Sequence, residues 1–319
     1  MFARLGASFG AVCAAFAVLT ACNGSGPPPL PSGARATRDG APAVAADGKY
    51  RIIYSFDGAY GVGGPNGGPP LAAPVLDAAG NLYGPAGGGT GNYIDCNGPC
   101  GVIFKMSQSG GKWKESVALN ISSWFHQAWP DSALAFDQKG NMYGGIGEWI
   151  YKLAPSGSGS WSFTPIYKNT HDAPGGVVPD SAGNLYGWLG KGVDYCGTIG
   201  ELSPRSSGWG YADLHNICRK DGFSPGGSDP RSPFSFDSRG NLYGTQYTGG
   251  PYRATNGYGT AFEMIRGGNG KWTYRVLHKF GAFRADGQNP WGGLAIGKSD
   301  SAYGTTIDGG PHGHGEIFE

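Results

Sequence analysis

The sequence predicts an all-β protein, a five-bladed β-propeller of four-stranded blades, over residues 49–319. Three observations predict it: a Gly-Asn-Leu-Tyr-Gly motif recurs along the chain, strand-like runs bounded by glycine lie between its copies, and the two ends of the region complement each other. A motif that recurs about every 40 to 60 residues indicates a propeller or another repeat array. Glycine, at 61 of 319 residues, falls at fixed places between apolar runs, as expected of turn-rich β structure.

A tyrosine marks each copy of the motif, and successive copies are 60, 43, 57 and 60 residues apart. The copies lie at Tyr83, Tyr143, Tyr186, Tyr243 and, in an altered form, Tyr303. Each repeat has an apolar run before the motif, the motif itself, a third run, and a fourth run. The fourth run begins with a tryptophan in the first four repeats. Four short strands joined by tight turns form one propeller blade.

The fifth repeat stops after its third run, at Glu319. Its fourth run is found at the other end of the region, because Tyr50–Phe56 matches Tyr274–Phe280 position for position in character. We therefore expect a strand from the N-terminal end to complete the last blade and close the ring. Closure would remove the open sheet edges that favour aggregation.

An Asp-x-x-Gly-Asn segment precedes four of the tyrosines. We interpret it as a hairpin turn in which the carboxylate accepts backbone hydrogen bonds and glycine adopts positive φ. The alternative, a calcium site, needs several oxygens close together, and each segment offers one carboxylate. The repeated tyrosine is interpreted as a packing residue between blades. The four carboxylates are those of Asp77, Asp137, Asp180 and Asp237.

Residues 1–21 are predicted to be an export signal, with Arg4 before a short apolar run. The segment Leu19-Thr20-Ala21-Cys22 resembles the bacterial lipobox, and this resemblance implies that Cys22 begins the mature protein and carries lipid. An ordinary signal with a chance cysteine is the alternative. Several acyl chains suffice for stable anchoring. Asn23, where an aspartate would signal retention at the inner membrane, points to the outer membrane of a Gram-negative-type cell, facing the periplasm or the surface.

Residues 22–48, rich in proline, glycine and alanine, are predicted to be a flexible tether that buries too little apolar surface to fold. Without residues 1–21 the chain has 23 basic and 23 acidic side chains, so charge gives no case for nucleic acid or for an anionic membrane surface. Membrane attachment is expected through the lipid alone, and the protein is expected to be a monomer.

Four further cysteines are predicted to form structural disulfides, since exported proteins meet an oxidising compartment. Cys96–Cys100 would close a small ring in a long loop. Cys196–Cys218 would lie opposite each other at the ends of one hairpin. A redox or zinc site is the alternative, although neither a C-x-x-C motif nor a paired histidine spacing supports it.

The pattern Asp-x-x-Gly-Asn-Leu-Tyr-Gly-Thr, then Gly-Gly, then Gly-Thr-x-Phe-Glu is similar to the GloVer tandem repeat of exported bacterial proteins. The match is best over Asp237–Met264 and covers about residues 50–319. The second repeat lacks the Gly-Gly loop, and the fifth lacks the aspartate and asparagine. The resemblance implies export with varied anchors. It implies no agreed activity and therefore no functional residues.

Long loops are predicted to emerge on one face of the ring and tight turns on the other. Loops on a rigid scaffold are where function usually lies. The aromatic residues of this face could stack on sugar rings or anchor a protein partner. The candidate ligand-binding residues are Tyr93, Trp124, Trp129, Trp188, Tyr252, Tyr258 and Trp291.

Two functions follow from this arrangement. The first is a non-enzymatic binding or scaffolding module, without cofactor or metal, for an envelope polysaccharide or protein. The second is a carbohydrate-active hydrolase or lyase, which would need two or three convergent buried carboxylates. Its candidates are Asp57, Asp172, Asp221, Asp229 and Asp286. His215 and His278 occupy repeat positions, and His312 and His314 are the only histidine pair with a metal-like spacing.

Overall fold

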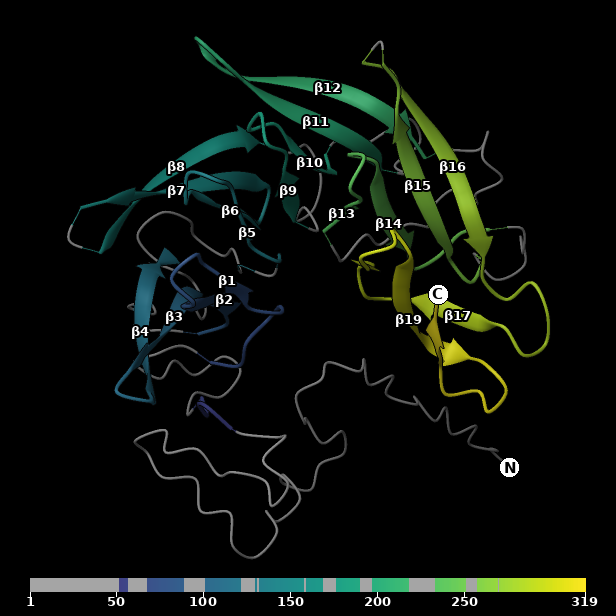
Figure 1. The fold of residues 1–319 in the computed structure, drawn as a ribbon, viewed down its shortest axis with the longest axis horizontal. Coiled ribbons are helices and arrows are strands. Elements are labelled where there is room, and N and C mark those ends of the chain that lie inside the picture. The colour runs from purple at the N-terminus through teal and green to yellow at the C-terminus, as the bar shows by residue number, and fades with distance from the viewer. Residues whose placement is uncertain are drawn as a thin grey trace, which may run out of the picture.

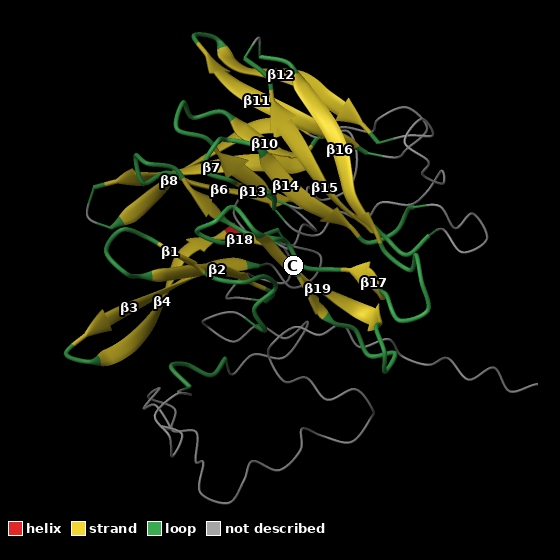
Figure 2. Ribbon diagram, turned by 45° about the vertical axis from the view of Figure 1, so that its right-hand side comes forward, coloured by secondary structure: helices red, strands yellow, loops and turns green. Residues whose placement is uncertain are grey.

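The five-bladed propeller is confirmed. The structure is a computed structural model that describes residues 52–56, 68–88, 101–121, 130, 132–157, 159–168, 176–189, 197–217, 233–250, 257–268 and 270–319. Within these residues, twenty strands form five antiparallel sheets of four strands. The sheets follow one another in chain order around a ring (Figure 1). Figure 2 shows that strands and their connecting loops make up nearly all of the described chain.

The first four blades share one order, in which each strand pairs with the next along the chain. Blade 1 comprises β1 (Val75–Leu76), β2 (Leu82–Ala86), β3 (Val102–Ser109) and β4 (Lys112–Asn120). Blade 2 comprises β5 (Ala135–Phe136), β6 (Met142–Ile146), β7 (Trp149–Ser156) and β8 (Ser160–Lys168). Blade 3 comprises β9 (Val177–Pro179), β10 (Leu185–Trp188), β11 (Thr198–Arg205) and β12 (Gly208–Asn216). Blade 4 comprises β13 (Ser235–Phe236), β14 (Leu242–Gln246), β15 (Thr260–Arg266) and β16 (Trp272–Lys279).

The Asp-x-x-Gly-Asn segments form the turn between the first two strands of these blades, as predicted. In blade 2, Asp137 Oδ1 accepts hydrogen bonds from the backbone nitrogens of Lys139 and Asn141, both at 2.9 Å. Asp137 Oδ2 accepts from Asn141 Nδ2 at 2.7 Å and from the Tyr143 hydroxyl at 3.0 Å. Gly140 has a φ of 78°. The carboxylate therefore organises the turn and is not free to act as a calcium ligand. The same backbone contacts recur at Asp77, Asp180 and Asp237.

These turns make the fold sensitive to acid. Burial alone raises the pKa of Asp137, but hydrogen bonds from Asn141 and Tyr143 outweigh it and hold the pKa below its ordinary value. The pKa values of Asp77 and Asp237 are lowered in the same way, with the following asparagine as the main donor. A carboxyl whose pKa is lowered by folding stabilises the fold above its unfolded-state pKa of about 4. That stabilisation is lost as the pH falls through the folded-state pKa.

We therefore expect the urea midpoint of unfolding to decrease steeply as the pH is lowered from about 5 to about 2. The Asp137→Asn variant, which cannot ionise at this turn, should start from a lower midpoint and show a shallower decrease. Circular dichroism at each pH measures both. A midpoint that does not change over this range would contradict the linkage.

The hydrophobic core is divided among the interfaces between neighbouring blades, where three of the four core clusters lie. The repeated tyrosine of one blade packs against the tryptophan near the start of the fourth strand of the next, which confirms its predicted role. The pairs are Tyr83–Trp161, Tyr143–Trp209 and Tyr186–Trp272, with ring centroids 5.7, 6.3 and 5.4 Å apart.

The glycine that follows the repeated tyrosine makes room for an aromatic ring. A Cβ atom on Gly244 would lie 2.6 Å from Phe262 Cζ and 2.8 Å from Phe234 Cδ1. A similar clash with Phe104 would arise at Gly84. The Tyr-Gly pair of the motif is therefore a packing requirement: the tyrosine covers the next blade, and the glycine admits a ring from the third strand of its own blade.

Blade 5 departs from the others because its first strand is interrupted. It comprises β17 (Gly287–Pro290), β18 (Ala295–Ile296), β19 (Ala302–Gly309) and β20 (Ile317–Phe318). β17 and β18 both pair with β19, at opposite ends of it, and β20 pairs with the middle of β19. All four strands of this sheet thus come from the C-terminal part of the chain.

The predicted closing strand, Tyr50–Phe56, is described over residues 52–56, and no strand is assigned there. These residues lie against blade 1, because Tyr54 and Phe56 pack on the core cluster that contains Phe104 and Met106. The predicted pairing of this segment with the last blade is not observed among the described residues.

Candidate functional site

The structure describes three of the seven aromatic residues predicted to bind a ligand, namely Trp188, Tyr258 and Trp291. The predictions for the other residues stay predictions, because those residues lie outside the part of the chain that the structure describes. Outside the described residues lie Tyr93, Trp124, Trp129, Tyr252, Asp57, Asp172, Asp221, Asp229, Cys22, Cys96, Cys100, Cys196 and Cys218.

Trp188 lies in the hydrophobic core, which corrects its predicted place on the exposed loop face. It is the last residue of β10 and is 4% exposed. The pleat of β10 turns its side chain toward blade 4, where the rings of Phe234 and Phe262 lie edge-on to the indole. The centroid distances are 5.3 and 5.9 Å. An indole covered in this way cannot stack on a ligand at the surface.

Tyr258 and Trp291 lie on the side of the ring predicted to carry the long loops, where the Tyr258 carbonyl is bonded to Asn289, two residues before Trp291. Tyr247 packs beside Trp291. We call Tyr247, Tyr258 and Trp291 the loop-face cluster. The rings of Tyr247 and Trp291 pack edge to face with centroids 5.1 Å apart. All three residues are half-buried. Flat amphipathic rings that are partly exposed can contact the apolar face of a sugar or an apolar side chain.

Asn289 holds this cluster together. Its backbone nitrogen donates to the Tyr258 carbonyl at 2.7 Å, and its Nδ2 donates to the Tyr247 carbonyl at 3.0 Å. Asn289 has a φ of 58°, a left-handed conformation that asparagine tolerates better than most residues. Backbone of this kind is often found at functional sites. Both ends of the β14–β15 loop are thereby tied to β17 of blade 5.

The sequence did not single out Tyr247 as a binding residue. It directly follows β14, in which alternate residues point to the same side of the sheet. Tyr243 and Thr245 face blade 5, where the Thr245 hydroxyl donates to the Gly292 carbonyl at 2.8 Å. The same alternation places Tyr247 beside Trp291. This alternation was the one feature of the sequence from which the position of Tyr247 could have been predicted.

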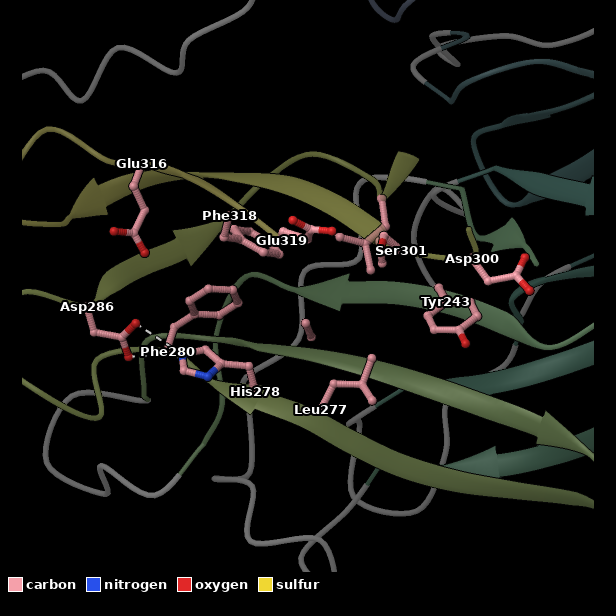
Figure 3. A pocket seen from close by; sticks show the side chains of 13 residues that line it. Tyr243, Leu277, His278, Phe280, Asp286, Asp300, Ser301, Glu316, Phe318 and Glu319 are labelled. Atoms are coloured by element: carbon pink, nitrogen blue, oxygen red, sulfur yellow. Dashed lines mark hydrogen bonds and ion pairs between the residues drawn. The ribbon is translucent and has the colours of Figure 1, made fainter. Parts of the chain in front are cut away.

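A groove of about 510 Å³ runs between blades 4 and 5 (Figure 3). His278 and Phe280 line it from blade 4, and Glu316 and Phe318 line it from blade 5. Asp286, on the connection between the blades, closes one end beside His278, as Figure 3 shows. The groove contains no lysine or arginine among its lining residues.

Asp286 is the one candidate catalytic carboxylate that the structure describes, and its oxygens are engaged. They lie 3.0 and 3.1 Å from His278 Nε2, and Oδ2 also accepts from the backbone nitrogen of Ala282 at 2.8 Å. Asp286 therefore organises the turn that follows β16. The histidine occupies the repeat position predicted for it.

Glu263, another buried carboxylate, is also paired. Its Oε1 accepts from the Tyr243 hydroxyl at 2.8 Å, and its Oε2 accepts from Arg275 Nε at 3.0 Å. Burial and the bond to Glu263 raise the pKa of Tyr243 to about 12. Each fully buried carboxylate in the described part of the chain, at Asp237, Glu263 and Asp286, thus has its own donors. None of them forms the convergent pair that glycoside hydrolysis requires.

His312 and His314 are exposed. Across the described ranges, no three histidine, cysteine, aspartate or glutamate side chains gather as a metal site would require. No helix among the described residues is long and apolar enough to span a bilayer.

Comparison with known proteins finds distant likenesses among solved structures. No family model matches the chain, and no curated protein matches it. Among solved structures, it is similar to PorZ, a surface component of the type-IX secretion system of Porphyromonas gingivalis. The TM-score is 0.46 and the identity 14%, over 81% of this chain and 34% of PorZ. The chain thus spans about a third of PorZ. A bifunctional GH43-CE protein of Bacteroides eggerthii has a TM-score of 0.42 and 15% identity, over 81% of this chain and 34% of that one. A protein of Lactobacillus plantarum has a TM-score of 0.36 and 9% identity, over 87% of this chain and 90% of that one.

Proposed function

We propose that this chain is a non-enzymatic propeller, tethered to the cell envelope through Cys22, that binds a polysaccharide with its long-loop face. The observation that carries the proposal is the loop-face cluster. Tyr247 and Trp291 present two rings nearly at right angles, 88° between planes, and hydrogen bonds from Asn289 hold both ends of the intervening loop in place. A preorganised pair of aromatic rings loses little entropy when a sugar stacks on it.

Two features favour binding over hydrolysis. The buried carboxylates Asp237, Glu263 and Asp286 are each used within the fold, so none is left as an acid or nucleophile. The aromatic cluster lies where loops meet on a rigid scaffold, which is the usual position of a recognition site.

Replacing Trp291 with alanine is expected to weaken polysaccharide binding roughly thirtyfold, equal to about 2 kcal/mol, because truncation of a well-packed aromatic anchor typically costs at least that much. A glycan array probed with the full chain, carrying Cys22→Ser so that it is not lipidated, identifies the glycan. Calorimetric titration of that glycan into both proteins then measures the change. The Trp291→Ala variant should remain folded, with its free energy of unfolding lowered by about 1 kcal/mol or less.

Leu76→Ala is the matched control, because Leu76 is 62% exposed beside a tight turn, on the other face of the ring. It should leave glycan binding unchanged. If no glycan on the array binds, or if the Trp291→Ala and Leu76→Ala variants bind equally well, the polysaccharide proposal is wrong. Retention of an envelope protein by the same chain would then favour a protein partner.

The tether is tested separately. Cys22→Ser should move the protein from the membrane fraction to the soluble fraction and remove the mass of the lipid from the mature N-terminus. Unchanged fractionation and mass would refute lipidation. The binding proposal would be unaffected, because it does not depend on the lipid.

A further inference from the structure

The tight turns of the ring carry basic residues from every blade. We call the tight-turn face the turns between the first and second strands of each blade and between the third and fourth strands of blades 1 to 4, with the strand residues that flank them. Blade 4 contributes three basic residues to its described part, and each other blade contributes one. They are Lys112, Lys139, Arg205, Arg239, Arg266, Lys271 and Lys298.

The acidic residues of this face are recessed behind the basic ones. All seven basic residues are exposed, whereas none of the acidic residues, at Asp77, Asp137, Asp180, Asp237 and Asp300, is exposed. In the pair of Arg239 Nη2 with Asp237 Oδ2, at 3.3 Å, the side chains are 66% and 0% exposed. In the pair of Arg266 Nη1 with Asp180 Oδ2, at 3.8 Å, they are 44% and 8% exposed. Positive charge therefore predominates at the surface.

The carboxylates are held inward because they organise the turns. Asp137 Oδ1 accepts from two backbone nitrogens of its own turn, and Asp300 accepts from Ser238 of the neighbouring blade. Several cations have no such partner. No ion pair with another described residue is formed by Lys112, Lys139, Arg205 or Lys298. These cations are available to an anionic partner.

The repeated turns of this face are short and uncovered. A Cβ atom on Gly80, Gly140, Gly183 or Gly240, one in each of blades 1 to 4, would meet no other atom within 4 Å. Short turns at the same level form a flat surface, and they lack the long loops that would enclose a single small ligand. A partner for this face is therefore extended and flat.

The loop side differs, because its described residues expose both signs of charge. Lys168 Nζ lies 3.2 Å from Glu148 Oε2, and their side chains are 58% and 56% exposed. Asp308 is exposed on the same side, as are Lys279 and Arg284. The equal numbers of acidic and basic residues in the whole chain conceal this asymmetry, since a count gives recessed carboxylates the same weight as exposed cations.

We propose that the tight-turn face docks on a surface of anionic lipid headgroups. Cations from all five blades are spread over the face, which suits a continuous layer of negative charge. Each lysine or arginine close to such a layer strengthens binding about fivefold. The attraction falls off within a Debye length of about 8 Å, so the exposed cations contribute more than the recessed carboxylates oppose.

Docking would fix the orientation of the ring, which the predicted tether leaves open. A flexible segment of the length of residues 22–48 has an end-to-end distance of about 30 Å, so it holds the ring near a membrane without selecting a face. With the tight-turn face on the headgroups, the loop-face cluster points away from the membrane. The docking itself depends neither on the lipid nor on polysaccharide binding.

Vesicle binding tests the docking. The mature chain, residues 22–319, contains every described residue and carries Cys22→Ser so that no lipid anchors it. At low ionic strength it should sediment with vesicles of phosphatidylglycerol and phosphatidylcholine, and not with vesicles of phosphatidylcholine alone. Replacing Lys112, Lys139 and Lys298 together with glutamine should weaken binding to the anionic vesicles roughly hundredfold, because three cations are lost at about fivefold each.

The matched control replaces Lys168, Lys279 and Arg284 with glutamine, which removes the same charge from the loop side. This variant should bind the anionic vesicles as the parent does. Equal loss of binding in the two triple variants, equal binding to both kinds of vesicle, or no binding to either would overturn the proposal. Binding to soluble alginate but not to vesicles, lost with the three tight-turn lysines, would overturn it in favour of an acidic polysaccharide.

A second measurement does not depend on the folding of variants. In the parent protein bound to anionic vesicles, Lys112, Lys139 and Lys298 should be acetylated several-fold more slowly than in the free protein, while the rate at Lys279 is unchanged. Mass spectrometry of peptides measures each rate. Equal protection at all four lysines would overturn the proposal. Neither experiment measures glycan binding, so their failure is distinguishable from failure of the proposed function.

Discussion

Replacing Trp188 with alanine is expected to destabilise the propeller by about 3–5 kcal/mol, the usual cost of truncating a buried tryptophan. The indole fills the interface between blades 3 and 4 and is covered by Phe234 and Phe262. Its loss leaves a cavity that neither blade can close without moving the other. Urea denaturation followed by circular dichroism measures the change in the free energy of unfolding.

The controls separate packing from surface effects. Trp188→Phe, which keeps an aromatic ring in the interface, should cost clearly less than the alanine variant. Trp291→Ala, at a half-buried position, should cost about 1 kcal/mol or less. A Trp188→Ala protein as stable as the parent would show that the indole is not part of the core and would restore its predicted place on the loop face.

Replacing Asp237 with alanine is expected to destabilise the fold by about 3 kcal/mol. Its carboxylate is buried and accepts from the backbone nitrogens of Arg239 and Asn241 at 2.9 and 2.8 Å, and from Asn241 Nδ2 at 2.8 Å. Alanine would leave these donors without an acceptor at a turn that positions Tyr243. The penalty arises from unsatisfied buried donors, so it should persist at high salt.

Asp308→Ala is the control for charge alone. Asp308 is exposed on β19, and its replacement should change the free energy of unfolding by no more than about 0.5 kcal/mol. If the Asp237→Ala and Asp308→Ala variants had equal stability, the carboxylates of the repeated motif would contribute net charge and not turn structure.

Asp300 belongs to the repeat that forms this turn without the repeated aspartate. It occupies the place of the positive-φ glycine and has a φ of 61°. Its carboxylate accepts from the backbone nitrogen and hydroxyl of Ser238 in the neighbouring blade, at 3.0 and 2.8 Å. The altered fifth copy of the motif therefore keeps the backbone turn, with bonds from Gly297 N to the Ser301 carbonyl at 2.8 Å and from Asp300 N to the Gly297 carbonyl at 3.1 Å. It uses its carboxylate for a contact between blades.

The structure of one blade could be predicted from the sequence. The strands of one repeat and the turn at Asp137 depend on residues close together in the chain, and a pattern that recurs five times reveals interactions that one copy would not. The packing role of Tyr83 and its equivalents could be predicted for the same reason, because each repeat offers the next the same tryptophan. Interactions that are local and that recur in each repeat can therefore be predicted from the spacing of residues along the chain.

Which aromatic residues are accessible and which carboxylates are free could not be predicted from the sequence and became clear from the packing of the blades. Trp188 and Trp291 both follow strand-like runs, yet blade 4 covers the first and leaves the second half exposed. Asp286 finds its donors in His278, on β16, and in Ala282, on the turn that follows β16. Whether a side chain is buried, and whether its polar atoms find hydrogen-bond partners, depends on residues that the ring brings together from distant parts of the chain. The spacing of residues along the chain does not show which of these residues become neighbours.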